Sequence, residues 1–354
     1  MDSESSTQRV LIYRLGSLGD TTVALPCFHL IARKYPLATR LLLTNYPVHA
    51  KAPASAAVLG ASGLIHGYMR YTVGTRSPVS LLRLAFEIRR FRPQVLVYLM
   101  PARTPRQLQR DLAFFRFACG AKRVVGAGQA AETSSVFDAA TGRYESEAFR
   151  LARVLSELGE AEPSQIGNWD LRLTEEEKTR AGAVLEPFRQ RPFFVCGPGT
   201  KMQAKDWGEA NWLALMKRLS QQYPDHGLAL VGAAEDKAVS DAVAAGWAGP
   251  TVNLCGQLSP RETAAVLEGA RVFLGPDSGP MHLAASVGVP AVIAFSARGL
   301  PGVWFPIGDR NQVIYHQTSC YGCNLETCIE QQRRCLTSIT IDEMVSAVQR
   351  ALQS

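Results

Sequence analysis

The sequence predicts an α/β protein made of two units, each a parallel sheet whose strands are connected by helices. Short apolar runs such as 10–13 and 193–196 are typical of buried strands, and segments with helical periodicity alternate with them. The alternation starts again in the middle of the chain, and 354 residues suit about two domains. We expect a first domain over 1–185, a second over 186–338, and a last amphipathic helix over 339–354.

Each expected element rests on a local pattern. Strands are expected where apolar residues run together, and helices where apolar residues recur at helical spacing. In the first half the strands are 10–13, 41–44, 95–100 and 124–125, with helices ending near Lys34 and covering 78–92. In the second half the strands are 193–196, 228–231, 272–274 and 291–295, with helices in 148–187, 209–222, 260–268, 281–287 and 341–352.

The composition argues against a disordered or fibrous chain and against one that spans a membrane. Apolar residues make up 47% and charged residues 19%, which is enough to bury a core in each domain. No apolar run approaches the roughly 18 residues that cross a bilayer, and the polar start MDSESSTQR does not resemble a signal peptide. We therefore expect a cytoplasmic protein. Its net charge of +7 moderately favours acidic partners.

The first candidate site is the loop RLGSLGD (14–20), between the first strand and the helix that follows it. Gly16 and Gly19 let backbone N–H groups approach a ligand closely. Asp20 lies at the expected helix start. Its carboxylate would either cap that helix or act as a general base at the mouth of a cleft between the domains. The glycine spacing does not match a dinucleotide-binding loop.

The second candidate site is GPGTKMQAKDWGEANW (197–212), after the first strand of the second domain. Thr200 offers a hydroxyl, and Lys201 and Lys205 place two ammonium groups beside a helix N-terminus, which together suit a diphosphate. The alternative is a pair of solvated lysines on a surface loop. The Gly-Lys-Ser/Thr order of a P-loop is missing.

The third candidate site is GPDSGPMHLAASVGVP (275–290), a strand end, a turn and a helix of small residues. Asp277 or Ser278 is expected to cap this helix, whose N-terminus would face an anion. His282 would donate a hydrogen bond to a phosphate or a sugar, unless it is a core histidine behind a structural turn. Glu235 follows another strand and would accept from ribose hydroxyls, unless it is an ordinary acid at a helix start.

Four of the eight cysteines lie close together, as Cys320-x2-Cys323-x4-Cys328-x6-Cys335. In a reducing compartment such a set favours metal ligands or thiols over disulfides. Four thiolates suit a tetrahedral structural metal, zinc or iron, and the alternative is reduced packing thiols or an occasional disulfide. The other four have apolar neighbours and are expected in the core: Cys27, Cys119, Cys196 and Cys255.

Positive charge is concentrated between residues 70 and 123, where twelve Lys and Arg residues stand against two acidic ones. Within this zone, VSLLRLAFEIRRFRP puts apolar residues and arginines on one helix. That helix suits contact with an anionic membrane surface or an acidic acceptor, and the alternative is a core-packing helix with a solvated face. No nucleic-acid module is present, so nucleic acid is not an expected partner.

Together these motifs resemble glycosyltransferase family 9, the ADP-heptose lipopolysaccharide heptosyltransferases and their relatives. The resemblance covers most of the chain and is strongest at RLGSLGD, at the PGT…KDW segment and at PDSGPMHLAASVGVP. It implies the GT-B architecture, two Rossmann-like domains facing across a cleft, with the last helix packing back toward the first domain. It also implies an inverting transferase that needs no metal, and no Asp-x-Asp motif is present to hold one.

The resemblance also implies roles for individual residues. Asp20, at the end of the loop with Gly16 and Gly19, matches the catalytic base. Lys205 matches the lysine that neutralises the donor diphosphate, and Glu235 matches the acid that contacts the ribose. The donor-binding residues that the resemblance implies are Thr200, Lys201, Lys205, Glu235, Asp277, Ser278, Gly279 and His282.

We therefore expect a heptose or related sugar to move from ADP-heptose or a similar donor to a glycan or glycolipid acceptor of the lipopolysaccharide type. No cofactor is required for catalysis, and the place of action is the cytoplasm or the inner face of the membrane. GAAED (232–236) and FSARGLPGVWFP (295–306) depart from the family pattern and leave the donor's identity open. A GT-B-type sugar-nucleotide 2-epimerase and a non-catalytic sugar-nucleotide-binding protein are the alternative classes.

Overall fold

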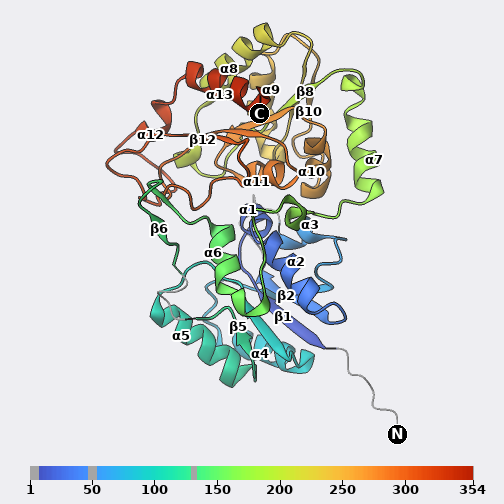
Figure 1. Cartoon of the computed structure of the whole chain (residues 1–354), viewed down its shortest axis with the longest axis vertical. Helices are drawn as coiled ribbons and strands as arrows, with labels where there is room; N and C mark the ends of the chain where they lie inside the picture. Colours follow the sequence, from blue (N-terminus) through green and yellow to red (C-terminus); the bar gives the residue numbers. More distant parts are fainter. Residues whose placement is uncertain (1–7, 47–53, 129–133, 354) are drawn as a thin grey trace. The chain divides into compact units, whose positions relative to one another are not determined.

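The structure is a computed structural model that describes residues 8–46, 54–128 and 134–353. The described residues form two compact units, and each is considered by itself (Figure 1). The first unit consists of the described part of 1–137 together with 145–168. The second unit consists of 138–144 and the chain from 169 onward.

The first unit contains a five-stranded parallel sheet with the strand order β3-β2-β1-β4-β5. The four expected strands are present, and β3 at one edge is an addition. Its residues are mostly half-buried and do not make the apolar run that indicates a buried strand. The strands are β1 (Arg9–Tyr13), β2 (Thr39–Asn45), β3 (Gly67–Tyr71), β4 (Val95–Tyr98) and β5 (Val124–Val125).

Proline positions decide where two helices of the first unit begin. The single helix expected up to Lys34 is two helices, because Pro26 has no N–H to donate and fits only in the first turn of a new helix. Pro78 likewise starts α4, behind the N-cap Ser77. The helical elements are α1 (Leu18–Thr22), α2 (Leu25–Lys34), α3 (Ser55–Leu59), α4 (Pro78–Phe91), α5 (Pro105–Ala113), the π-helical η1 (Phe114–Ala118), α6 (Glu147–Val154) and the 3-10 turn η2 (Ser156–Leu158).

The second unit contains a six-stranded parallel sheet with the strand order β10-β9-β8-β11-β12-β13. The four expected strands form its centre, and the partly exposed edge strands β10 and β13 are additions. The strands are β8 (Phe193–Cys196), β9 (Gly227–Leu230), β10 (Thr251–Asn253), β11 (Val272–Pro276), β12 (Ala291–Phe295) and β13 (Gln312–Tyr315). A separate small sheet pairs β6 (Phe137–Asp138) with β7 (Arg143–Tyr144).

The helices of the second unit lie close to their expected positions. The stretch 148–187, which runs from the first unit into the second, differs from expectation: it breaks into α6, short 3-10 turns and α7, with Gly159 at a φ of +120° after α6 and η2. The helices are α7 (Glu175–Val184), α8 (Glu209–Gln222), α9 (Lys237–Ala244), α10 (Pro260–Glu268), α11 (Gly279–Ser286), α12 (Arg334–Thr337) and α13 (Ile341–Gln353). The 3-10 turns are η3 (Ile166–Trp169), η4 (Glu186–Phe188), η5 (Gln203–Lys205) and η6 (Ala234–Asp236).

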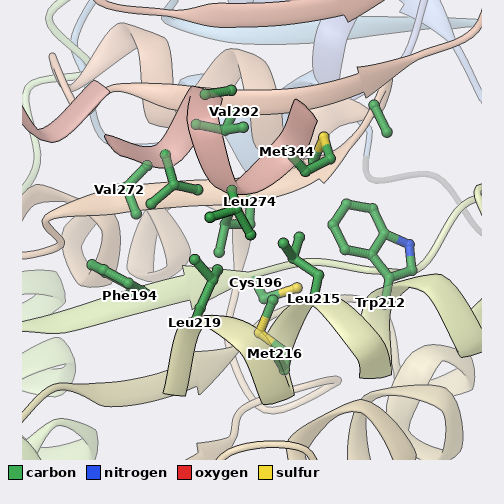
Figure 2. Packing of buried hydrophobic residues seen from close by; sticks show 14 of the residues in the cluster. Phe194, Cys196, Trp212, Leu215, Met216, Leu219, Val272, Leu274, Val292 and Met344 are labelled. Carbon is green, nitrogen blue, oxygen red and sulfur yellow. The ribbon is translucent and has the colours of Figure 1, made fainter. Parts of the chain in front are cut away.

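A core cluster of the second unit joins the sheet to helices α8 and α13 (Figure 2). Leu215 from α8 lies beside Cys196 of β8 and Leu274 of β11, and Trp212 from α8 and Met344 from α13 belong to the same cluster. Burying one Leu or Met side chain fully contributes about 1.5–3 kcal/mol. Helix α13 therefore completes the core of the second unit. Its packing toward the first domain stays a prediction.

The segment 169–185 belongs to the second unit, whereas the sequence placed it with the first. Arg261 on α10 supplies the reason. Its buried guanidinium donates to Glu177 on α7 at 2.5 and 2.9 Å, and to the carbonyl oxygens of Leu171 and Arg172 at 2.8 Å. Because a buried guanidinium must find acceptors for its N–H groups, α10 fixes the chain that enters α7.

Glu177→Gln tests this link. Burial raises the pKa of the Glu177 carboxyl, but hydrogen bonds from Arg261 and the Thr174 N–H outweigh burial, so the pKa lies below its usual value. The carboxylate therefore adds stability above the pKa of the unfolded chain, and this contribution is lost as the pH falls through the folded pKa. We expect Gln to lower the free energy of unfolding by about 1.5–3 kcal/mol at neutral pH.

Urea titrations at neutral and at acid pH measure the effect. The difference between wild type and Glu177→Gln should shrink as the pH falls below about 4. Glu176→Gln, on the exposed neighbour in the same helical turn, is the control and should unfold like wild type. An equal loss in both variants would contradict the anchoring role of Arg261.

Candidate functional site

The strand order of the second sheet reverses between β8 and β11. From β8 the chain passes through α8 to β9 on one side, and from β11 it passes through α11 to β12 on the other. Open α/β sheets bind ligands at such a point, outside the carboxyl ends of the strands. The loop after β8 and the turn after β11 carry the second and third sequence motifs, so both motifs lie at this position.

An ion pair joins these two segments. Lys205 Nζ, at the end of η5, lies 2.9 Å from Asp277 Oδ2. The Lys205 side chain is 19% exposed and the Asp277 side chain 8% exposed. The pair is only partly desolvated, so an incoming anion can reach the ammonium group and share it with the carboxylate. The structure thus brings together two of the predicted donor-binding residues.

Ser278, rather than Asp277, occupies the N-cap position of α11. Its Oγ makes no bond to the helix and is buried without a hydrogen-bond partner among the described residues. Gly279 is the first residue of the helix, whose free N–H groups and dipole favour an anion. A buried hydroxyl without a partner is rare in folded proteins. This unpartnered hydroxyl lies directly beside the free N–H groups at the start of α11.

His282 lies on the first turn of α11 and is 5% exposed. Its ring stands edge-on to Trp304, with the ring centroids 6.3 Å apart. Trp304 comes from the connection between β12 and β13 and was not singled out from the sequence. A large aromatic residue in the connection that follows a central strand is the signal that points to it.

Thr200 and Lys201 lie on the same loop as Lys205. Thr200 is half-buried, and its Oγ1 accepts from the Met202 N–H at 3.4 Å, which shapes the loop. Lys201 is exposed. Glu235, in the turn η6 after β9, is exposed as well, and it forms no ion pair with Lys205, whose carboxylate partner is Asp277.

Asp236, the acidic residue next to Glu235, packs against the loop after β8 that contains Gly199 and Lys205. A Cβ on Gly232 would lie 2.8 Å from Asp236 Oδ2, and a Cβ on Gly199 would collide with the Asp236 carboxyl group. The Ala233 N–H donates to Asp236 Oδ2 at 2.9 Å. Gly199 is therefore needed for the approach of Asp236, a residue that the sequence interpretation missed.

The segment that contains the four C-terminal cysteines holds the loop of Lys205. Gln203 exchanges hydrogen bonds with the backbone of Cys328, at 2.8 and 3.5 Å. Arg333 donates to the Asp206 carbonyl oxygen at 2.7 Å and pairs with the Asp206 carboxylate at 3.1 Å. Residues on both sides of Lys205 are thus fixed from this segment.

The expected metal site at Cys320, Cys323, Cys328 and Cys335 is not formed. Within the described ranges, no group of three or more His, Cys, Asp or Glu side chains is arranged to hold a metal ion. Three of the four thiols have polar neighbours of their own: Cys320 lies 3.4 Å from Thr318 Oγ1, Cys328 accepts from the Arg333 N–H at 3.4 Å, and Cys335 lies 3.9 Å from Ser296 Oγ.

The other four cysteines are buried free thiols, as predicted: Cys27, Cys119, Cys196 and Cys255. Burial raises the pKa of Cys255 to about 11, so this thiol stays protonated at neutral pH.

The first unit has its own reversal of strand order, between β1 and β4, and RLGSLGD follows β1 at that point. Gly16 has a φ of +148°, and a Cβ on it would lie 2.5 Å from Asp20 Cγ. Only glycine fits there, because the backbone must pass the Asp20 side chain. The Gly16 N–H donates to Asn45 Oδ1 at 2.7 Å. Gly19 lies inside α1 and has no such conformation.

Asp20 is the third residue of α1, and Ser17 is the N-cap. Asp20 Oδ2 accepts from the Ser17 N–H at 2.8 Å and lies 3.2 Å from Ser17 Oγ. The carboxylate thus supports the helix start by reaching back, as the third residue of a capping box does. Its Oδ1 accepts no hydrogen bond from the described residues, so that oxygen is available to a proton donor. The capping and base interpretations are compatible.

Three buried residues beside Asp20 were not singled out from the sequence. Arg14, in the same loop motif, donates to the Asp20 carbonyl oxygen and pairs with Glu147, which in turn pairs with Arg150. An arginine directly after a buried strand is a signal that points to Arg14. Its partners on α6 are far away in the sequence and leave no local signal.

Helix α4, in the basic zone, has two apolar faces. One face is buried in the core of the first unit. The other carries Val79, Leu82 and Phe86, each of them at least 66% exposed. Helical spacing places Arg83 and Arg90 beside this exposed stripe. Packing against the core explains the buried apolar face of α4, but it does not explain the exposed apolar residues on the other face.

In the described parts of the chain, we find no helix with the length and apolar character needed to cross a membrane. Residues 1–7, which supply most of the polar start, lie outside the described residues.

Comparison with known proteins adds independent information. The family model of glycosyltransferase family 9 (heptosyltransferase) matches residues 113–333. Lipopolysaccharide heptosyltransferase 1 of Pseudomonas aeruginosa is 28% identical over 169 residues, which are 48% of this chain and 44% of that enzyme. The match therefore spans less than half the length of this curated relative.

Two solved structures resemble the whole chain. The glycosyl transferase family 9 protein of Veillonella parvula has a TM-score of 0.72 at 16% identity, over 99% of each chain. The ADP-heptose lipopolysaccharide heptosyltransferase II of E. coli has a TM-score of 0.67 at 17% identity, over 98% of this chain and 99% of that one. This likeness confirms the predicted α/β class and the GT-B fold. Because the family model matches more than half of its residues, the chain belongs to glycosyltransferase family 9.

Proposed function

We propose that the chain transfers a heptose or a related sugar from a nucleoside-diphosphate donor to a lipopolysaccharide-type or other glycan acceptor, with inversion at the anomeric carbon. Membership of the family supports the reaction class. The name of the P. aeruginosa relative supports a heptose as the transferred sugar, and that of the similar E. coli structure supports ADP-heptose or a close analogue as donor. The observation that carries the proposal is the Lys205–Asp277 pair at the strand-order reversal of the second unit.

Three features at this position suit a diphosphate leaving group. The Lys205 ammonium is a compact positive charge that an anion can reach. The Ser278 hydroxyl lacks a partner, and the start of α11 presents backbone N–H groups. Preorganised charge of this kind acts most strongly where negative charge develops in the transition state. We infer that these groups stabilise the negative charge that develops on the departing diphosphate.

The remaining donor contacts are assigned by position. Thr200 and Lys201 add a hydroxyl and a second cation on the adjacent loop. His282, at the start of α11, is proposed to donate to a phosphate or sugar oxygen. Glu235, exposed after β9, is proposed to accept from the ribose hydroxyls, as acids after sheet strands do in nucleotide-binding folds.

Asp20 is proposed as the general base. The acceptor oxygen forms a bond to the anomeric carbon while its proton passes to Asp20 Oδ1. The bond between the anomeric carbon and the diphosphate oxygen breaks, and its electron pair leaves with the nucleoside diphosphate. Attack from the face opposite the leaving group inverts the configuration. Ser17 holds the other carboxylate oxygen, which keeps the base oriented.

We also propose that the exposed face of α4 contacts an anionic membrane surface from which a glycolipid acceptor is taken. Its apolar stripe, Val79, Leu82 and Phe86, would enter the boundary between headgroups and acyl chains. Arg83 and Arg90 beside the stripe would face the lipid phosphates. Each basic residue near such a surface contributes about 1 kcal/mol, and the cytoplasmic leaflet carries this negative charge.

Asp20→Asn tests the base. Asn keeps an acceptor for the Ser17 N–H, so the start of α1 is preserved, but the amide cannot take a proton. We expect the rate of sugar transfer to fall about 10²–10⁴-fold, with the Kd for ADP unchanged. Single-turnover transfer assays and calorimetric titration with ADP measure the two quantities. Asp309→Asn, on an exposed loop, is the control, and near-wild-type transfer by Asp20→Asn would remove the base assignment.

Lys205→Met tests the diphosphate site. Loss of one charge-assisted contact worth about 1.5–3 kcal/mol should raise the Kd for ADP about 10–100-fold. Lys237→Met is a matched control, because Lys237 pairs with Asp241 at 2.8 Å elsewhere in the same unit. The control should bind ADP like wild type. Equal affinities for all three proteins would rule out Lys205 as the diphosphate ligand.

Leu82→Ser and Phe86→Ser test the membrane contact. We expect wild type to co-sediment with vesicles that contain phosphatidylglycerol and not with pure phosphatidylcholine, and to dissociate in high salt because salt screens the arginines. Both variants should bind the anionic vesicles more weakly, since they lose buried apolar area. Leu37→Ser removes an exposed leucine outside α4 and should bind as wild type does. Binding that does not depend on lipid charge would contradict the proposed contact.

A further inference from the structure

A set of three buried charged side chains lies beside Asp20 in the first unit. Arg14 directly follows β1 and is 0% exposed, while Glu147 and Arg150 on α6 are 3% and 1% exposed. Arg14 Nη1 lies 3.2 Å from Glu147 Oε1, and Arg150 holds the two oxygens of Glu147 at 2.7 and 2.9 Å. One carboxylate thus joins two guanidinium groups, which leaves one positive charge in excess.

Both guanidinium groups are also anchored to the chain that follows β4. Arg14 Nη1 donates to the carbonyl oxygen of Leu99 at 3.2 Å, and Arg150 Nη2 donates to that of Met100 at 2.7 Å. Since β1 and β4 are neighbours at the reversal of strand order, the set occupies the place where a ligand-binding crevice opens in this fold.

The remaining donors of Arg14 reach the backbone of Asp20. Nη2 and Nε donate to the Asp20 carbonyl oxygen at 2.7 and 3.2 Å. Helix α1 ends at Thr22, and the Ala24 N–H, which would serve this carbonyl in a longer helix, donates to Thr21 instead. Arg14 therefore replaces the missing helical hydrogen bond.

Asp20 is consequently held at three points. Arg14 fixes its carbonyl oxygen, Ser17 fixes Oδ2, and the side chain packs against the α-carbon side of Gly16. A helix of five residues does not maintain its own geometry, so these external contacts decide where the remaining oxygen points.

We propose that Arg14 is a positioning residue for the Asp20 carboxylate, and that Glu147 and Arg150 hold the Arg14 guanidinium in place for this task. The proposal rests on the proposed role of Asp20 as the base. A contribution to stability alone would explain less, because buried ion pairs add little net stability over apolar packing. The set also directs two donors at one carbonyl of the base, which stability does not require.

Arg14→Lys tests the proposal. Lysine keeps the positive charge but cannot present two coplanar donors to one carbonyl oxygen. We expect kcat for sugar transfer to fall about 10–100-fold, because a displacement of about 1 Å at a reacting group costs on the order of 100-fold. The KM for the donor and the Kd for ADP should stay at their wild-type values, since the proposed donor site is built by the second unit.

Arg40→Lys is the matched control. Arg40 is 5% exposed in the same unit and donates to the carbonyl oxygens of Tyr35, Leu64 and Gly63. Like Arg14, it is a buried arginine that donates to several backbone carbonyl oxygens, but it makes no hydrogen bond to Asp20. We expect a comparable fall in Tm with kcat unchanged. Equal losses of kcat in both variants would show that Arg14 acts only through stability and would overturn the proposal.

Arg150→Lys is the second variant, for use where Arg14→Lys does not fold. It loosens Glu147 while leaving the bonds between Arg14 and Asp20 in place, so kcat should fall by less than in Arg14→Lys, again at constant KM. Wild-type kcat in the folded arginine variants, together with an inactive Asp20→Asn, would overturn the positioning role and leave the proposed function standing. Full turnover by Asp20→Asn would instead remove the base assignment itself.

Discussion

In a parallel sheet all strands end at the same edge, so the segments that follow two neighbouring strands have to share one space. This constraint brings Lys205 and Asp277 within 2.9 Å of each other, although they belong to different motifs. It acts in the same way in the first unit, where Arg14 after β1 reaches Leu99 after β4. The chemistry proposed for the chain depends on these two meeting points, and the helices and core hold the strands in register.

The ion pairs at these two positions differ in how far they are exposed to solvent. In the second unit the Lys205 side chain keeps 19% of its surface in solvent, so its pairing with Asp277 can be shared with a ligand. In the first unit Arg14 and Glu147 are almost completely buried, Arg14 donates to protein oxygens, and Glu147 accepts from Arg14 and Arg150. An accessible pair suits binding and release. The buried ion pairs of the first unit suit a structural role. A guanidinium group whose N–H groups all donate to protein oxygens is held in one orientation.

The sequence predicts the centres of both sheets well, because fully buried parallel strands are continuous apolar runs. The edge strands β3, β10 and β13 are missed since their half-exposed residues lack that signal. In the candidate site, Asp20, Lys205 and Asp277 could be named from their motifs. Arg14 and its partner Glu147 could not be paired, because that contact joins elements far apart in the sequence and only the folded sheet brings them together.

The hydrogen bonds between the cysteine segment and the loop of Lys205 affect how mutagenesis of this region has to be interpreted. Gln203 and Asp206 flank Lys205 and are held by Cys328 and Arg333. Alkylation of Cys328 would place a bulky group beside the backbone that binds Gln203 and would disturb the loop of Lys205. A change of nucleotide affinity after thiol modification would therefore be expected even though no cysteine belongs to the proposed diphosphate site. Conversely, a fluorescent label on the exposed Cys323 offers a sensor placed next to a segment that donor binding should stiffen.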